Sequence, residues 1–211
     1  MIGFPALHTL IRGSLAILVA AALTNCGSET FSYDRDTRNK MIVSVRDQKM
    51  LLVRDGSPIK AYKISTSKFG LGDRPGSNCT PIGRLQVAKK IGDNAPLGSV
   101  FKTRRPTGEV IKPNAPGRDP VVTRIMWLTG TESRNQNAFR RTIYIHGTPE
   151  ECRLGSPASF GCIRMGSTDV ADLYNRIGMG ADVFVIRGSI QSKKGEHESA
   201  SIDSHNFGPR G

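Results

Sequence analysis

The sequence predicts a mainly β domain with one short helix packed against its strands. Two observations carry this prediction. Short apolar segments rich in β-branched residues recur along the chain and are separated by turns of Gly, Asp, Ser and Pro, as in antiparallel sheets. Between residues 167 and 177, by contrast, the apolar residues repeat at the spacing of one helical face.

The strands are predicted from apolar runs and from alternation with period two. The first three are joined by tight turns, of which residues 55–58 are typical. Residues 66–80 are rich in Gly, Ser, Asp and Pro and predict a loop. Strands are expected at 41–45, 49–54, 59–65, 81–88, 121–128, 141–145 and 182–187, with His146 at the end of the sixth.

Residues 89–120 depart from this pattern. They contain many glycines and prolines and little periodicity, which predicts a long excursion over the surface with no more than one weak hairpin. An excursion of this length inside a compact domain often marks a binding lid.

The single helix has signals at both ends. Ser167 or Thr168 is expected to cap it, with Asp169 in the first turn, where the helix dipole favours an anion. Gly178 and Gly180 are expected to end it. Its apolar face consists of Val170, Leu173, Tyr174 and Ile177.

The first 26 residues predict a secretory signal. Arg12 precedes an apolar run over 15–23, which is too short to span a bilayer. A short buried helix is the alternative interpretation. Export would place the protein outside the cytoplasm, which in a bacterium means the cell envelope or periplasm.

The end of this signal resembles a bacterial lipobox. Residues 23–26 finish on Cys26, which makes Cys26 a candidate lipid anchor to the membrane. Asn25 departs from the small residue that usually precedes such a cysteine. Plain cleavage near 20–22 is therefore the alternative.

The remaining chain divides into a linker, one domain and a tail. Residues 27–39 are expected to be the linker and 40–188 the folded domain. Residues 189–211 are rich in Ser, Gly, Lys, Glu and His. Such a segment buries too little apolar surface to offset its ordering entropy, so it predicts a disordered tail.

The net charge is +12, which favours a polyanionic partner. No segment resembles a nucleic-acid-binding module, so no nucleic-acid partner is expected. An anionic cell-wall polymer suits both the charge and the predicted export. The alternative is a generally basic proteome without a specific partner.

His146 and Cys162 are the candidate catalytic pair. A thiolate is a strong nucleophile, and a neighbouring imidazole is the usual group that generates it. Gly161 permits close backbone approach, so the Gly161 and Cys162 amides are candidate donors to an oxyanion. The start of the following helix would further favour a thiolate. The pair therefore predicts acyl transfer through a thioester; the alternative is a buried thiol and a structural histidine.

Metal binding and disulfide formation are the alternative roles for the cysteines. Zinc binding by His146, Cys152 and Cys162 lacks any CxxC or HxxxH pair, so no metal and no cofactor is expected. A disulfide from Cys152 to Cys162 would remove the nucleophile or gate it by oxidation. The pairing of Cys152 with Cys162 or with Cys79 stays open.

These residues resemble the signature of the L,D-transpeptidase catalytic domain. The resemblance covers residues 40–187 and implies a β-sandwich-like fold with one short helix. Phe160 stands where many members of the family have a second histidine. His146 is therefore the one histidine expected to activate Cys162. The resemblance is carried by the segments 80–83 (Thr-Pro-Ile-Gly), 146–150 (His-Gly-Thr-Pro-Glu) and 159–165 (Ser-Phe-Gly-Cys-Ile-Arg-Met), with Gly155 and Asp169.

The resemblance also implies a substrate and roles for individual residues. The substrate would be a peptidoglycan stem peptide, cleaved after its third residue with release of the terminal D-alanine. An amine acceptor then gives a 3→3 cross-link or a wall-attached protein, and water gives carboxypeptidase or wall-protein-releasing activity. A non-catalytic peptidoglycan-binding lipoprotein is the remaining alternative. The roles are Cys162 as nucleophile, His146 as proton acceptor and donor, Gly147 as the orienting carbonyl, and Arg164, Ser159 and Thr148 as substrate-binding residues.

Overall fold

A computed structural model of the chain describes residues 34–190. The predicted secretory signal, Cys26 and most of the predicted tail lie outside the described residues, so export, lipidation and the domain boundaries stay predictions. Within residues 34–190, no helix has the length and apolar character needed to cross a membrane.

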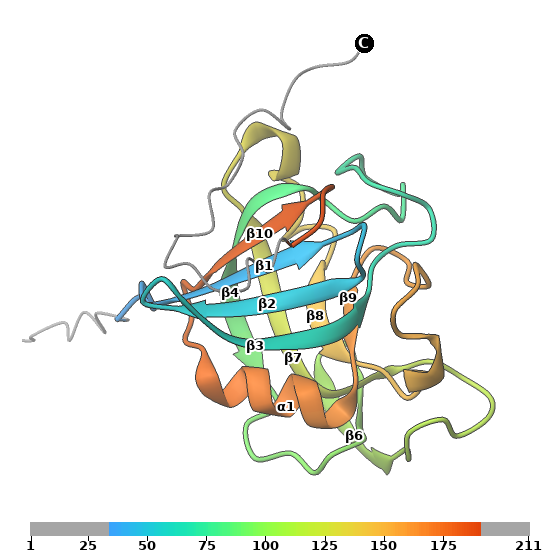
Figure 1. Cartoon of the computed structure of the whole chain (residues 1–211). Helices are drawn as coiled ribbons and strands as arrows, with labels where there is room; N and C mark the ends of the chain where they lie inside the picture. The colour runs from blue at the N-terminus through green and yellow to red at the C-terminus, as the bar shows by residue number, and fades with distance from the viewer. Residues whose placement is uncertain (1–33, 191–211) are drawn as a thin grey trace, which may run out of the picture. The chain divides into compact units, whose positions relative to one another are not determined.

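The strands form one sheet that closes on itself (Figure 1). Their order is β4-β10-β1-β2-β3-β9-β8-β7-β5-β6, and β4 also pairs with β7. This last pairing closes the strands from β4 to β7 into a ring, beyond which β5 and β6 extend as a hairpin. The bounds are β1 (Asn39–Ser44), β2 (Lys49–Arg54), β3 (Ser57–Ser65), β4 (Gly83–Ile91), β5 (Ser99–Lys102), β6 (Arg105–Val110), β7 (Val121–Gly130), β8 (Tyr144–Gly147), β9 (Ile163–Met165) and β10 (Asp182–Ile186).

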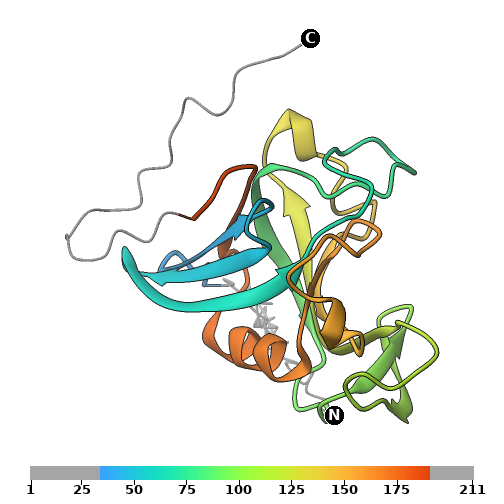
Figure 2. The ribbon, with the colours of Figure 1, turned by 45° about the vertical axis from the view of Figure 1, so that its right-hand side comes forward.

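The closed sheet has two layers around an apolar core. In Figure 2 the layer of β1 to β3, blue to teal, diverges from the layer of β4 and β7, green and yellow. Alternate residues point inward: Met41 of β1 lies opposite Leu52 of β2, and both are fully buried. The prediction of a mainly β fold with one helix is confirmed.

The helix α1 (Ser167–Arg176) packs against β7 and β8. The predicted apolar face is confirmed, since Val170, Leu173, Tyr174 and Ile177 are all buried. The predicted cap is wrong. Gly166 is the N-cap residue and has no capping side chain; instead, the Glu151 carboxylate accepts from the Ser167 amide at 2.8 Å, so a distant side chain supplies the acceptor.

Three further expectations are corrected. The sixth strand begins at Tyr144 rather than at 141, because Thr142 and Ile143 close a turn through bonds to the carbonyls of Phe139 and Ala138. His146 therefore lies inside β8 and not at its end. The strand β9 was not predicted. The excursion over 89–120 does contain a hairpin, β5–β6, as the sequence allowed.

Candidate active site

The two chemically important segments meet because β8 and β9 run side by side in parallel. Ile145 lies opposite Ile163, and His146 lies opposite Arg164. Ile145 and Ile163 are fully buried in the main core. Since successive strand residues point to opposite faces, His146 and Arg164 share the other face. Cys162 directly precedes β9 and, two residues before Arg164, lies on the same side.

Cys162 is partly exposed at this face and packs beside a smaller apolar cluster that contains Tyr144. The Tyr144 amide donates to the Cys162 sulfur at 3.4 Å. Burial raises the pKa of the Cys162 thiol to about 11, although that bond and the positive charges of Arg141 and Arg164 pull it down. The resting group is therefore a thiol, which needs a base when it attacks.

His146 is only 5% exposed and has a fixed orientation. Its Nδ1 lies 2.8 Å from the carbonyl oxygen of Gly147, so Nδ1 carries the proton and Nε2 is left with a lone pair. Burial lowers the pKa of His146 below its ordinary value, against the raising effects of the Gly147 bond and Asp119, while Arg164 lowers it further. At neutral pH the ring is therefore uncharged and able to accept a proton.

Glycine at position 147 is a steric requirement of this arrangement. A Cβ added there would lie 2.6 Å from the backbone oxygen of Val122 and 3.2 Å from Cβ of Thr123, both in β7. The tight approach of β7 and β8 therefore depends on the missing side chain.

The loop before Cys162 is held by internal hydrogen bonds. Thr80 donates from Oγ1 to the Gly161 carbonyl at 3.0 Å. Ser159 donates from Oγ to the Cys162 carbonyl at 2.6 Å and accepts from the Gly161 amide at 3.2 Å. The Gly161 amide is thus engaged within the loop, and an oxyanion role for it requires this last bond to be exchanged.

Two predicted substrate-binding residues are enclosed by their own contacts. Ser159 and Thr148 are buried. Thr148 donates from Oγ1 to Asp119 and accepts from the Glu150 amide at 3.0 Å. Both hydroxyls therefore stabilise the loops around the pair and face no open surface.

Arg164 is 3% exposed and lies in a cluster of charges. Its Nη1 contacts both Asp119 and Glu150, the latter at 3.1 Å. Its Nε and Nη2 atoms are buried without a hydrogen-bond partner among the described residues. These two nitrogens form the edge of a guanidinium that binds a carboxylate through two bonds. The Nη1 group of Arg164 is therefore paired, whereas the edge formed by Nε and Nη2 is buried and has no acceptor among the described residues.

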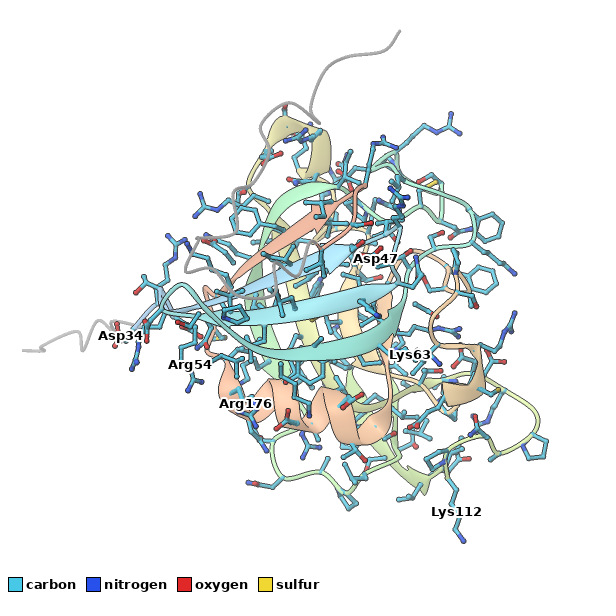
Figure 3. All side chains as sticks on the ribbon, viewed as in Figure 1. Asp34, Asp47, Arg54, Lys63, Lys112 and Arg176 are labelled. Carbon is cyan, nitrogen blue, oxygen red and sulfur yellow. The ribbon has the colours of Figure 1, made fainter. Side chains whose placement is uncertain are left out.

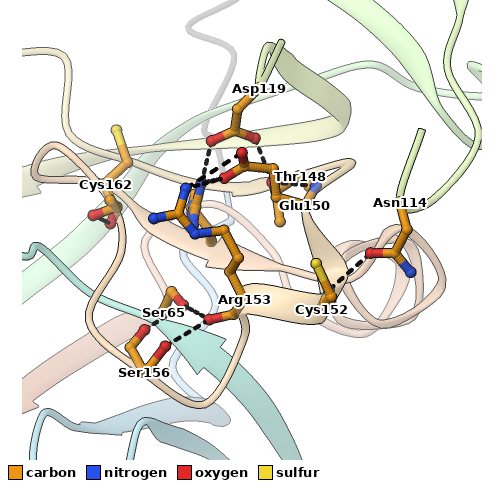
Figure 4. Close-up of polar contacts among 12 residues, drawn as sticks. Ser65, Asn114, Asp119, Thr148, Glu150, Cys152, Arg153, Ser156 and Cys162 are labelled. Atoms are coloured by element: carbon orange, nitrogen blue, oxygen red, sulfur yellow. Dashed lines mark hydrogen bonds and ion pairs between the residues drawn. The ribbon is translucent and has the colours of Figure 1, made fainter. Parts of the chain in front are cut away.

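The end of the excursion is pinned over this cluster (Figure 4). Asn114 donates from its amide to the Pro149 carbonyl at 2.6 Å and accepts from the Cys152 amide at 2.8 Å. Asp119, also on this segment, reaches Arg164 and Thr148. Sequence reasoning missed Asp119 because no motif marks it; Glu150 was within the quoted signature, but no role was assigned to it.

Two hollows of the molecule lie apart from the candidate pair. One hollow is lined by residues that include Asp47, Lys63 and Gly155; Figure 3 labels the first two. Another is lined by residues that include Arg84 and Phe184. Neither lining contains Cys162 or His146.

The thiols in the described residues are free. Cys79, Cys152 and Cys162 form no disulfide with one another, so the open question of Cys152 pairing is resolved in this structure as unpaired. The helix α1 packs in the main core, whereas Cys162 adjoins the smaller cluster on the other face. The expected influence of the helix start on the thiol stays a prediction. Residues 34–190 also hold no group of three or more candidate metal ligands.

Comparison with known protein families identifies the class of this domain. The family model for the L,D-transpeptidase catalytic domain, YkuD, matches residues 38–186. The chain belongs to this family. No curated protein sequence matches it.

Several solved L,D-transpeptidase structures are similar at low identity. The enzyme from Mycobacterium tuberculosis H37Rv is 18% identical, with 71% of this chain and 58% of that one covered and a TM-score of 0.46. The Enterococcus faecium enzyme is 19% identical, with coverage of 71% and 50% and a TM-score of 0.46. The Xylanimonas cellulosilytica enzyme is 18% identical, with coverage of 72% and 62% and a TM-score of 0.46. The chain thus spans between half and two thirds of their lengths.

Proposed function

We propose that this chain is an exported, cysteine-dependent L,D-transpeptidase that acts on peptidoglycan stem peptides through a thioester. The observation that carries the proposal is the shared face of His146 and Cys162, with His146 Nδ1 held by the Gly147 carbonyl. This geometry leaves Nε2 as the base and Cys162 as the nucleophile. The basic charge of +12 suits an anionic wall polymer.

In the acylation step, Nε2 of His146 takes the thiol proton as Sγ of Cys162 attacks the carbonyl carbon of the third stem residue. The C–N bond breaks, and the proton passes from His146 to the departing D-alanine amine. Because burial disfavours both charged forms of the resting pair, the proton moves during attack and does not leave a standing thiolate.

Arg164 is proposed to bind a substrate carboxylate. Its Nη1 already holds Asp119 and Glu150, while Nε and Nη2 are buried and unpaired. A buried guanidinium edge without an acceptor is costly, and a carboxylate would satisfy both nitrogens together. This contact would place the stem peptide against the face that carries Cys162.

The test is turnover of a synthetic tetrapeptide stem, followed by mass spectrometry of the products. Cys162→Ala is expected to abolish D-alanine release while the thermal unfolding temperature stays unchanged. Cys152→Ser is the matched control, because Cys152 is exposed and free, and it should retain full activity under reducing conditions. Retained turnover in Cys162→Ala contradicts the proposal. The products also separate a cross-linking enzyme, which yields a dimer, from a carboxypeptidase, which yields the tripeptide.

A further inference from the structure

Two exposed phenylalanines meet beside the candidate nucleophile. Phe69 is 49% exposed and Phe160 is 63% exposed, and their ring centroids lie 5.4 Å apart. Contiguous apolar surface that is exposed to solvent can mark a binding site. Phe160 precedes Cys162 by two residues, so this pair of rings adjoins the reacting atom's own loop.

A lysine completes the group, which we call the Phe platform: Lys68, Phe69 and Phe160. The Lys68 ammonium lies 4.4 Å from the ring centroid of Phe160 and 5.2 Å from that of Phe69. Within residues 34–190, no carboxylate forms an ion pair with Lys68, whereas Arg141 and Arg164 are both paired. The platform therefore offers apolar surface together with a positive charge that pairs with no carboxylate among the described residues.

The platform is fixed relative to Cys162 by hydrogen bonds. The Lys68 amide donates to the Ser159 carbonyl at 3.1 Å. Ser67 donates from its amide to Thr80 Oγ1 at 2.9 Å, and Thr80 in turn holds the Gly161 carbonyl. The two loops thus form one unit, so a ligand on the platform has a defined position relative to the thioester.

We propose that the Phe platform is the subsite for the acyl acceptor, a second carboxylate-bearing peptide chain that presents an amine. This inference rests on the proposed function. Arg164 lies two residues after Cys162 and Phe160 two residues before it, so the two candidate subsites adjoin opposite ends of the short segment that carries the nucleophile. The first stem peptide is then bound as the thioester and held by Arg164. The second chain would approach from the exposed side that carries Phe160.

The chemistry of the platform matches that partner. The rings cover the aliphatic part of the acceptor side chain, and the Lys68 ammonium binds a carboxylate of the same peptide. The acceptor amine then attacks the thioester carbon, the C–S bond breaks, and a new amide forms. The amine proton returns to the Cys162 sulfur by way of His146, so no further reactant is needed.

The experiment measures how the thioester divides between amine and water. The full chain is given a tetrapeptide stem as both donor and acceptor, and the cross-linked dimer, tripeptide and released D-alanine are quantified. For Phe69→Ser/Phe160→Ser, we expect the ratio of dimer to tripeptide to fall about tenfold, the loss that accompanies forfeited burial of an aromatic ring. The rate of the first D-alanine release should stay within about twofold, since acylation needs no acceptor.

Two further variants sharpen this test. Lys68→Gln keeps both rings and removes the positive charge, so it should lower the ratio of dimer to tripeptide. Added salt should lower the same ratio in the wild type, because it screens the Lys68 charge. Ile59→Ser is the control, because Ile59 is also an exposed apolar residue, at 43%. It lies at the opposite end of β3 from the residues that pair with β9. The product ratio of this variant should not change.

The outcomes are distinguishable. An unchanged product ratio in the double variant overturns the acceptor subsite. A fall in acylation that matches the fall in dimer also overturns it, because the platform would then serve the first substrate. If the wild type itself never forms the thioester, the proposed function fails before the subsite is reached.

Discussion

The two faces of the β8–β9 pair have opposite compositions and opposite tasks. On the inner face, Ile145, Ile163 and Met165 are fully buried in the main core. On the outer face lie His146 and Arg164, with Cys162 directly before β9. A shift of one residue would exchange the two sets, so the apolar residues determine the register and the polar residues take their positions from it. The placement of the reacting groups is thus a consequence of core packing.

The largest effect should come from the outer face. His146→Ala is expected to lower turnover by about 10²–10⁴, the usual contribution of a positioned acid–base group. Residues 34–190 contain no other histidine that could take its place. The free energy of unfolding should change far less than activity does. Steady-state kinetics with the tetrapeptide stem check this, and a loss of less than about threefold would assign His146 a structural role.

Asp119→Asn should change the pH dependence of acylation. Asp119 raises the pKa of His146, whereas burial and Arg164 lower it; Glu150 shares Arg164 with Asp119. Loss of the negative charge therefore lowers the pKa of His146 further, and the base form persists to more acidic pH. The acidic limb of the rate profile should move to lower pH.

The control for this variant is Glu109→Gln, since within residues 34–190 the Glu109 carboxylate pairs only with Arg118, in an exposed ion pair. Its pH profile should match that of the wild type. A profile of Asp119→Asn that moves to higher pH, or does not move, would contradict the assigned influence of Asp119 on His146.

The inner face should respond in stability and not in chemistry. Ile163→Val removes one buried methylene and is expected to cost about 0.5–1.5 kcal/mol of unfolding free energy. The acylation rate per folded molecule should stay within about twofold of the wild type, as the outer side chains are untouched. Chemical denaturation and a burst assay on the same samples separate the two quantities. If the acylation rate falls by more than the loss of folded protein explains, the two faces of the β8–β9 pair are not independent.

Sequence periodicity predicted the elements that are long enough for their apolar residues to show a repeat. The strands from β1 to β3 and the face of α1 belong to this group. β9 was missed because it has three residues, too few for alternation to show. The start of β8 was misplaced because backbone bonds at Thr142 and Ile143 close a turn that the side chains do not mark.

The candidate site was predictable only in part. His146, Cys162 and Gly147 were found because short motifs contain them. Asp119 was not, since it reaches Arg164 across 45 residues of chain and carries no local signal. Ser159 and Thr148 were expected at the substrate, yet each is buried in hydrogen bonds that hold the loops; the residue type alone does not distinguish these two uses of a hydroxyl.

The proposed chemistry depends above all on Cys162 as the residue that accepts the acyl group. The most direct measurement is the intact mass of the protein during turnover of the tetrapeptide stem, with digestion to locate the adduct. We expect a mass increase equal to the tripeptide acyl group, located on Cys162 and reversed by hydroxylamine, and no such increase in Cys162→Ala. The same adduct on Cys79 or Cys152, or its persistence in Cys162→Ala, would contradict it.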